Sequence, residues 1–383
     1  MHEIKRISIE GYRRLASVKD VEMRPLTVLI GPNNVGKTSF LDVLSLLAAS
    51  AVGQMSQKIT EFGGITSMLT RGTASEFTVD LQADQSPNPS LLYHLSLRPA
   101  GQTYEVAEET LTQESDRPSP FKHIDSRPAN IHYFDPQTQR LVRPNWEHDP
   151  LESSLSQVPK MYQQAETFRK RLASLAYYAS LDLDVSRKSP LRLPQQMRPA
   201  TLPGPAGEQL VSCLYCLRET NRERFDMIQE TLTSAFPGFE RMDFPPVAAG
   251  TLALTWKERH FPTPIYMHEL SEGTIRFLWL VTLLQSPGLT EITLIDEPEV
   301  SLHPDLLRLL VDLLREASSR TQLVVATHSD RLVRFLKPAE VLVCDCEDGN
   351  TAMRWGDSFE LDKWLEDYGL DELWRMGRLG ARS

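Results

Sequence analysis

A glycine-rich segment between Gly31 and Thr38 carries the clearest chemistry in this sequence. It reads GPNNVGKT and follows the apolar run LTVLI directly. Gly31 and Gly36 would let the backbone wrap around phosphate oxygens, with N–H groups and the N-terminus of a following helix directed at the anion. Lys37 would place a positive charge on the β- and γ-phosphates, and Thr38 would offer a hydroxyl to Mg²⁺. We call this segment the phosphate loop and expect it to bind a nucleotide.

A pair of adjacent carboxylates, Asp296 and Glu297, ends the apolar run ITLI and forms the second chemical element. In a parallel sheet, the carboxyl end of this strand would face the same phosphates as the phosphate loop. Asp296 would then serve Mg²⁺, directly or through water, and Glu297 would orient a water molecule and accept its proton. A strand that simply ends in a polar turn is the alternative, and the presence of Lys37 favours the chemical interpretation.

Two shorter segments could complete such a site. His328 follows the run QLVVA and could reach the γ-phosphate, although a lone histidine is usually structural. Ser271, in LSEGT, can cap the next helix, whose N-terminus carries partial positive charge. Ser271 lies well before the acid pair in the sequence. In a compact fold, this separation would hinder its contact with the nucleotide bound by the same chain. We therefore expect it to contact the γ-phosphate held by Lys37 of a second copy, so that ATP joins two subunits; an ordinary helix cap is the alternative.

The surrounding sequence predicts the elements that must position these residues. Strands are expected over residues 3–10 and 22–31, with a helix from Lys37 to about Ala51. Residues 112–150 are rich in Pro, Asp, Ser and Asn and are expected to be mostly loop. Helices are predicted over 157–179 and, with one break, over 207–235. Short apolar strands are predicted in the last third, at TLALTWKE, EITLIDE, TQLVVATHS and AEVLVCDCE.

Composition excludes several classes of protein. The chain has 383 residues, with 41 Lys and Arg against 51 Asp and Glu, a net charge of −10. This balance argues against a nucleic-acid binder held by bulk charge, although the segment 187–198, which includes Arg192, is either a surface loop or a local DNA contact. No apolar run reaches the length of about 20 residues that a membrane span needs. The N-terminal segment lacks a signal-peptide core, so we expect a cytoplasmic protein.

The four cysteines stand in two pairs. They are Cys213 with Cys216, in a helical pattern, and Cys344 with Cys346, at the end of a predicted strand. No histidine lies within metal-ligand spacing of either pair. We therefore interpret them as buried or half-buried thiols in a reducing cytosol rather than as a zinc site.

Taken in order, the phosphate loop, LSEGT, LIDEPEVSLHP and ATHS resemble the ABC-type ATPase head of the RecF, SMC and OLD-nuclease superfamily. The segments GYRRL, FGGITSMLTRG and LDELWRMGRLG narrow the resemblance to the small bacterial stand-alone AAA-type ATPases of that group. The resemblance implies an α/β fold with a mixed or parallel central sheet, an N-terminal antiparallel β portion and an inserted, mainly helical lobe. We expect the lobes at residues 1–110, 111–250 and 251–383.

The resemblance also implies roles for single residues. Glu297, His328 and Lys37 would be catalytic, and Thr38 and Asp296 would serve Mg²⁺. A glutamine that bridges Mg²⁺ and the attacking water is expected as well; we assign it to Gln157, with Gln54 and Gln57 as rivals. Ser301 to Pro304 match a loop that crosses the dimer interface. The expected nucleotide-binding residues are Arg13, Asn33, Asn34, Val35, Gly36, Lys37, Thr38, Ser39, Ser271 and Gly273.

The function expected from these residues is that of an ATP-gated switch. ATP and Mg²⁺ would join two heads into a dimer, within a higher oligomer or alone, and hydrolysis would release them. The output would pass through a companion effector protein, DNA, or both, in DNA repair or in defence against phage. The ATPase subunit of a membrane transporter is the alternative enzyme. A scaffold that binds ATP without hydrolysis is the third candidate, against which Asp296, Glu297 and His328 argue.

Overall fold

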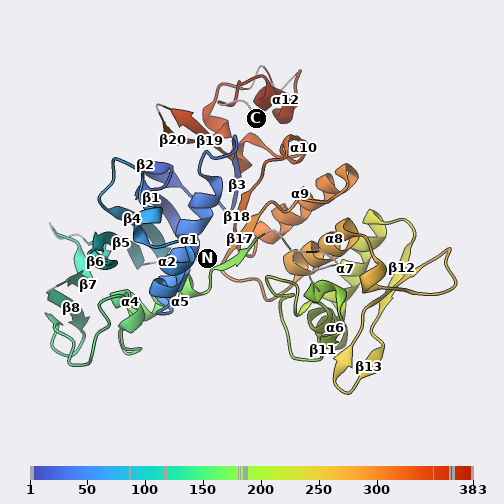
Figure 1. The fold of residues 1–383 in the computed structure, drawn as a ribbon, viewed down its shortest axis with the longest axis horizontal. Coiled ribbons are helices and arrows are strands. Elements are labelled where there is room, and N and C mark those ends of the chain that lie inside the picture. The colour runs from blue at the N-terminus through green and yellow to red at the C-terminus, as the bar shows by residue number, and fades with distance from the viewer. Residues whose placement is uncertain are drawn as a thin grey trace. The chain divides into compact units, whose positions relative to one another are not determined.

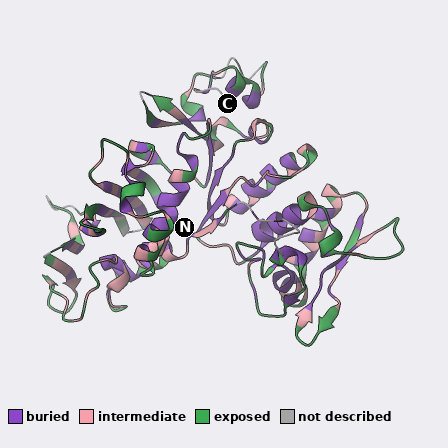
Figure 2. Ribbon diagram, viewed as in Figure 1, coloured by how far each residue is buried: buried purple, intermediate pink, exposed green. Residues whose placement is uncertain are grey.

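The apolar run before the phosphate loop forms strand β3 (Leu26–Ile30), all of which is buried. It pairs in parallel with β19 (Val341–Glu347), and β19 pairs in antiparallel register with β20 (Asn350–Trp355). A strand that is buried on both faces has a continuous apolar sequence rather than an alternating one, as LTVLI has. Figure 2 shows β3 in purple, the colour of buried residues.

The helix that follows the loop, α1 (Lys37–Ala51), is also buried along most of its length. It contacts α2 (Met55–Glu61), α4 (Ser154–Gln157) and α5 (Gln163–Ala173). A helix covered on several sides can be apolar nearly all round, which explains the run of apolar residues in α1. The phosphate loop is therefore held between a buried strand and a buried helix.

The chain packs as two compact units. The first contains residues 1–176, 338–368 and 372–383, and the second contains residues 177–337 and 369–371. The predicted lobe boundaries near residues 110 and 250 stay a prediction. The structure is a computed structural model, and it describes residues 4–85, 88–115, 119–128, 130–179, 181, 183, 189–347, 349–361, 364 and 367–380.

The first unit contains an antiparallel sheet in the order β2-β1-β4-β5-β6-β7-β8-β9 (Figure 1). The prediction that residues 112–150 are mostly loop missed three strands of this sheet, β7, β8 and β9. Strands with one exposed face need few apolar residues, so their polar composition resembled loop. The strands are β1 (Ile4–Tyr12), β2 (Leu15–Glu22), β4 (Phe77–Gln85), β5 (Asn88–Ala100), β6 (Thr103–Gln113), β7 (Phe121–Arg127), β8 (Asn130–Asp135) and β9 (Arg140–Val142). The unit also contains α3 (Ile65–Met68), η4 (Pro338–Glu340) and η5 (Gly356–Ser358).

The second unit contains a parallel pair of apolar strands, β17 (Ile292–Asp296) and β18 (Gln322–Ala326), connected through helix α9 (Pro304–Ser318). Asp296 pairs with Ala326, so both strands end at the same level. The helix α9 is amphipathic, with leucines buried at helical spacing and a proline at its first position, where a missing N–H costs nothing.

Further helices and short strands complete the second unit. Helix α8 (Glu272–Gln285) is buried from Ile275 onwards. The predicted helix over 207–235 is confirmed as α6 (Leu210–Thr220) and α7 (Arg222–Ala235), and the single break falls at Asn221, whose side chain caps α7. The other elements are α10 (Asp330–Val333), η2 (Pro190–Arg192), η3 (Met267–Glu269), β11 (Gln195–Gln196), β12 (Phe239–Asp243), β13 (Pro246–Ala248), β14 (Thr251–Leu252), β15 (Thr255–Glu258) and β16 (Ile265–Tyr266). Both β10 (Ala176–Tyr178) and α12 (Leu370–Arg375) cross the division between the units.

These elements confirm the predicted α/β class. Parallel pairing occurs at β3 with β19 and at β17 with β18, and the antiparallel β portion lies in the N-terminal part of the chain. The phosphate loop belongs to the first unit, and the acid pair belongs to the second.

Candidate nucleotide-binding and catalytic site

The phosphate loop turns from β3 into α1 through residues with positive φ. The φ angle is 149° at Gly31, 62° at Asn34 and 111° at Gly36. A Cβ on Gly31 would lie 2.1 Å from the carbonyl oxygen of Cys344, and a Cβ on Gly36 would lie 2.9 Å from Cδ2 of Leu15. Backbone conformation and close packing therefore both require glycine at these two positions.

Lys37 begins α1 and is buried in the loop, with 3% of its surface exposed. Its Nζ donates hydrogen bonds to the carbonyl oxygens of Gly31, at 2.6 Å, and Pro32, at 2.8 Å. These bonds hold the ammonium group of Lys37 at the phosphate loop. Thr38 is exposed in the first turn of α1, where its hydroxyl is accessible to a metal ion.

Four other residues predicted to bind the nucleotide lie in the phosphate loop or in the first turn of α1, and their binding role stays a prediction. Asn33 and Asn34 are exposed, Ser39 is half-buried, and Val35 is buried. An aliphatic anchor under polar, exposed neighbours is the arrangement expected of a loop that presents its backbone to a ligand.

Thr351, on β20, contacts the backbone of the phosphate loop through its hydroxyl group. The sequence analysis did not identify this residue. Its Oγ1 lies 2.6 Å from the carbonyl oxygen of Val35 and 2.9 Å from that of Arg14. It also lies 3.2 Å from the Cβ position of Gly36. The contact joins residues more than 300 positions apart in the chain, and no local pattern could have revealed it.

Arg13 is bound to the side of α1. Its φ angle is 44°, and its Nη1 donates to Oδ2 of Asp42 at 2.6 Å. Burial raises the pKa of Asp42, although Arg13 lowers it. The guanidinium group also lies over the Phe62 ring, 5.5 Å from its centroid. Arg13 thus belongs to the same unit as the phosphate loop, and its approach to a nucleotide stays a prediction.

The acid pair and His328 lie together in the second unit. Nε2 of His328 is 3.7 Å from Oε1 of Glu297, and each side chain is about one third exposed, 33% and 38% respectively. The backbone N–H of Glu297 donates to the carbonyl oxygen of Ala326 at 2.8 Å, with Glu297 at a φ of 49°. A non-glycine residue with positive φ at a strand end is often found at functional sites. The parallel pairing therefore places a carboxylate and an imidazole side by side.

Tyr177, at β10, is a second residue that the sequence did not reveal. Its hydroxyl donates to Oδ2 of Asp296 at 3.3 Å. Both residues belong to the second unit. The contact orients the carboxylate that is expected to serve Mg²⁺.

The segment Leu270–Thr274, which we call the signature tip, leads into α8, and its residues Ser271 and Glu272 are exposed. The Ser271 side chain accepts a hydrogen bond from the N–H of Thr274 at 3.1 Å, which confirms its predicted capping role. A Cβ on Gly273 would lie 2.5 Å from the carbonyl oxygen of Ser301. The signature tip and the loop at Ser301 therefore form one surface, and Gly273 permits their close approach.

Arg192 supports the signature tip from inside the second unit. Its Nη1 donates to the carbonyl oxygens of His268, at 3.0 Å, and Leu270, at 3.1 Å. It is 9% exposed, so the surface-loop and DNA-contact interpretations were both wrong for this residue. Arg187 and Lys188, of the same segment, lie outside the described residues.

Gln157 does not fit the metal-bridging role predicted for it. Its side chain contacts His148 and accepts a hydrogen bond from the N–H of Asp149, and it donates to nearby carbonyl oxygens. Gln157 is the last residue of α4. The Oγ of its neighbour Ser156 lies 3.8 Å from the position that a Cβ on Gly53 would take, and Gly53 lies just beyond the end of α1. The start of α1 lies about 20 Å away, at 1.5 Å per residue. Gln54 and Gln57 follow the same distant end of α1, so neither rival fits better.

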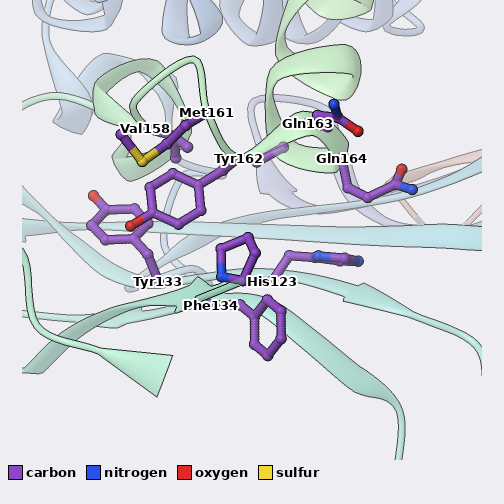
Figure 3. A pocket seen from close by; sticks show the side chains of 10 residues that line it. His123, Tyr133, Phe134, Val158, Met161, Tyr162, Gln163 and Gln164 are labelled. Atoms are coloured by element: carbon purple, nitrogen blue, oxygen red, sulfur yellow. The ribbon is translucent and has the colours of Figure 1, made fainter. Parts of the chain in front are cut away.

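A separate pocket of about 400 Å³ lies in the first unit, beside β7, β8 and the start of α5. Figure 3 shows Tyr162 beside Tyr133, with Met161 and Val158 above them in this view, and the two tyrosine ring centroids are 6.5 Å apart. Burial lowers the pKa of the lining residue His123 to about 4, which keeps it neutral at pH 7. This aromatic, uncharged lining does not suit a triphosphate.

A strand, phosphate loop and helix, with an acid pair and a histidine at the ends of two parallel strands, are features of the P-loop ATPase fold. The family described as "AAA domain, putative AbiEii toxin, Type IV TA system" matches residues 26–334, and the chain belongs to this family. No curated protein matches the sequence. Two solved head domains have a similar fold at low sequence identity.

The first is the SmcHead bound to the C-winged helix domain of ScpA, with a TM-score of 0.55 and 14% identity over 95% of this chain and 99% of that one. The second is an Smc head domain with an extended coiled coil, bound to the C-terminal domain of ScpA derived from Pyrococcus furiosus. Its TM-score is 0.54, with 12% identity over 96% of this chain and 99% of that one. At these identities the likeness shows the fold, and it confirms the predicted ATPase-head architecture. Within the described residues, no helix combines the length and apolar character needed to cross a membrane.

Proposed function

We propose that the protein hydrolyses ATP and that bound ATP joins two copies of the chain into a switch for a partner protein. The observation that carries this proposal is the pairing of Glu297 with His328 at 3.7 Å, at the ends of two parallel strands. A carboxylate that can accept a proton, next to an imidazole that can contact the γ-phosphate, is the pair that hydrolysis of a triphosphate needs.

The residues of the first unit would bind the triphosphate. In the proposed complex the Lys37 ammonium contacts the β- and γ-phosphates, and the loop N–H groups and the start of α1 face the phosphate oxygens. Glu297 orients the attacking water and takes its proton as the bond to the γ-phosphorus forms.

Mg²⁺ fits the residues that are present. Thr38 presents an exposed hydroxyl, and Asp296 is a half-buried carboxylate oriented by Tyr177, both of which are hard oxygen donors. When bound, Mg²⁺ would neutralise charge on the β- and γ-phosphates. We propose Thr38 and Asp296 as its protein ligands.

The Tyr177 contact predicts a change in metal requirement. Replacing Tyr177 with phenylalanine removes the hydroxyl and lets the Asp296 carboxylate rotate. Because such a bond contributes about 1 kcal/mol, we expect the Mg²⁺ concentration for half-maximal turnover to rise about 5-fold, with a smaller change in the maximal rate. Magnesium titrations of ATPase activity measure this, with Tyr266→Phe, an exposed tyrosine of the same unit, as the control. Identical titration curves would remove Tyr177 from the metal site.

The signature tip is proposed to complete the site of a second copy. Its hydroxyl and the helix N-terminus are exposed, next to the Ser301 loop, on one surface of the second unit. A γ-phosphate is the natural ligand for a serine hydroxyl at a helix N-terminus. Because ADP lacks that phosphate, only ATP would hold the dimer.

Ser271→Arg tests the shared site. An arginine at the signature tip should block the approach of the partner and reduce turnover by at least about 10²-fold, as expected for loss of an oriented transition-state contact. The affinity of one chain for ATP should stay within about 3-fold, because the single chain keeps its phosphate loop. Ser234→Arg, at the exposed end of α7, is the matched control. Full activity in Ser271→Arg would exclude the signature tip from catalysis.

The partner is proposed to be a companion effector protein. The family description names a putative toxin of a toxin–antitoxin system, which favours a role in defence over that of a transporter subunit. The net charge of −10 gives no bulk attraction for DNA, so duplex DNA would act only through a local contact. Turnover measured with duplex DNA, and separately with the purified product of an adjacent gene, distinguishes the two outputs. If neither duplex DNA nor the adjacent gene product changes the rate of ATP turnover, the proposed switch role is contradicted.

A further inference from the structure

Glu299 lies two residues beyond the acid pair and has no part in the proposed reaction, yet it shapes the turn that carries His328. Its Oε1 accepts hydrogen bonds from Oγ1 of Thr327, at 2.5 Å, and from the backbone N–H of His328, at 3.2 Å. The Thr327 hydroxyl oxygen in turn accepts one from the N–H of Ser329 at 3.0 Å. One carboxylate therefore fixes, directly or through Thr327, all three residues of Thr327–Ser329, which we call the switch turn.

One oxygen of the Glu299 carboxyl group is out of contact with water. Its Oε2 is shielded from solvent and has no hydrogen-bond partner among the described residues. Burial raises the pKa of Glu299, although the bonds from Thr327 and from the His328 N–H lower it. Burying a carboxyl oxygen without a hydrogen-bond partner costs free energy, and the two bonds to Oε1 offset part of that cost.

The bonds of Glu299 act on the catalytic geometry. The Glu297 backbone is already fixed to Ala326, the residue just before the switch turn, by a 2.8 Å hydrogen bond. Glu299 fixes the switch turn that follows Ala326, so the acid pair and His328 share one hydrogen-bonded frame. Without Glu299, the buried Thr327 hydroxyl and the His328 N–H lose their acceptor.

We infer that Glu299 is a positioning residue that holds the switch turn so that His328 faces Glu297 and the γ-phosphate. This inference rests on the proposed ATPase function. The chemistry requires only an acceptor oxygen at the Oε1 position, so glutamine should replace glutamate here. Alanine should not.

Hydrogen exchange of the nucleotide-free protein tests the frame without any activity. In Glu299→Ala, the amides of His328 and Ser329 should exchange at least about 10-fold faster than in the wild type. The His328 N–H loses its acceptor, and the Thr327 hydroxyl that accepts from the Ser329 N–H is no longer held by Glu299. In Glu299→Gln, exchange of the same amides should match the wild type. Peptides covering α9 serve as the internal control, and thermal unfolding reports whether each variant is folded. Unchanged exchange in a folded Glu299→Ala would overturn the inference.

Steady-state kinetics test the consequence for turnover. We expect Glu299→Ala to lower kcat about 10- to 100-fold with KM for ATP within about 3-fold, because a small displacement of an oriented group has effects of this size. Thr327→Val should lower kcat as well, and the double variant should fall no further than the lower single variant. Thr293→Val, which removes a buried hydroxyl at the other end of β17, is the matched control.

The outcomes separate this inference from the proposed function. Wild-type kcat in Glu299→Ala, or a kcat in Glu299→Gln as low as in Glu299→Ala, would contradict positioning while leaving Glu297 as the proposed base. Absence of ATP turnover in the wild-type chain would instead contradict the proposed function, and the exchange measurement would still decide whether Glu299 holds the switch turn.

Discussion

Replacing Glu297 with glutamine is expected to lower ATP turnover by about 10²- to 10⁴-fold, the usual contribution of a general base. Glutamine keeps the shape of the side chain and can still orient water, but it cannot accept a proton. ATP binding should persist, because the phosphate loop is untouched. Steady-state phosphate release gives the rate, and equilibrium titration with a fluorescent ATP analogue gives the affinity.

The matched control for this variant is Glu291→Gln. Glu291 is an exposed glutamate immediately before β17, and its backbone carbonyl, which accepts from Gln322, is unchanged by the substitution. We expect wild-type turnover in this control. Equal turnover in Glu297→Gln and the wild type would remove Glu297 from the reaction, and the acid pair would then have only the metal role of Asp296.

Replacing Lys37 with alanine is expected to weaken ATP binding about 100-fold. The ammonium group is the buried cation of the phosphate loop, bonded to two loop carbonyl oxygens, and its charge-assisted bonds to phosphate are worth about 1.5–3 kcal/mol. Calorimetric titration with ATP and Mg²⁺ measures the affinity. Turnover at moderate ATP concentration should fall in parallel.

Two controls separate charge from folding in this experiment. Lys37→Met keeps most of the buried side-chain volume and should bind ATP as weakly as Lys37→Ala. Lys170→Ala removes a largely exposed lysine of α5 and should bind ATP as the wild type does. An affinity within about 3-fold of the wild type in both Lys37 variants would contradict phosphate recognition by this loop.

The sequence predicted those parts of the site in which chemistry and backbone lie in one short segment. The phosphate loop needed glycine at two positions for local backbone reasons, and the structure has positive φ at both. The acid pair and His328 each followed an apolar strand, and parallel pairing was enough to bring them together. Ser271 capped a helix in the expected way.

The residues that sequence reasoning missed act through contacts between distant segments. Tyr177 reaches Asp296 and Thr351 reaches Val35, and neither position carries a local signal. Glu299 was visible within DEPEVSLHP, but its bonds to Thr327 depend on the register of two strands. The resemblance implied a bridging glutamine without fixing which one, and packing at the far end of α1 places Gln157 away from the phosphate loop.

The particle mass of Glu297→Gln in solution tests the shared nucleotide most directly. Light scattering after size-exclusion chromatography, in Mg²⁺ with ATP, should give twice the mass of one chain, whereas ADP or no nucleotide should give the mass of one. A single-chain mass with ATP and Mg²⁺ at saturating concentration would contradict the account, as would a dimer that forms equally well with ADP.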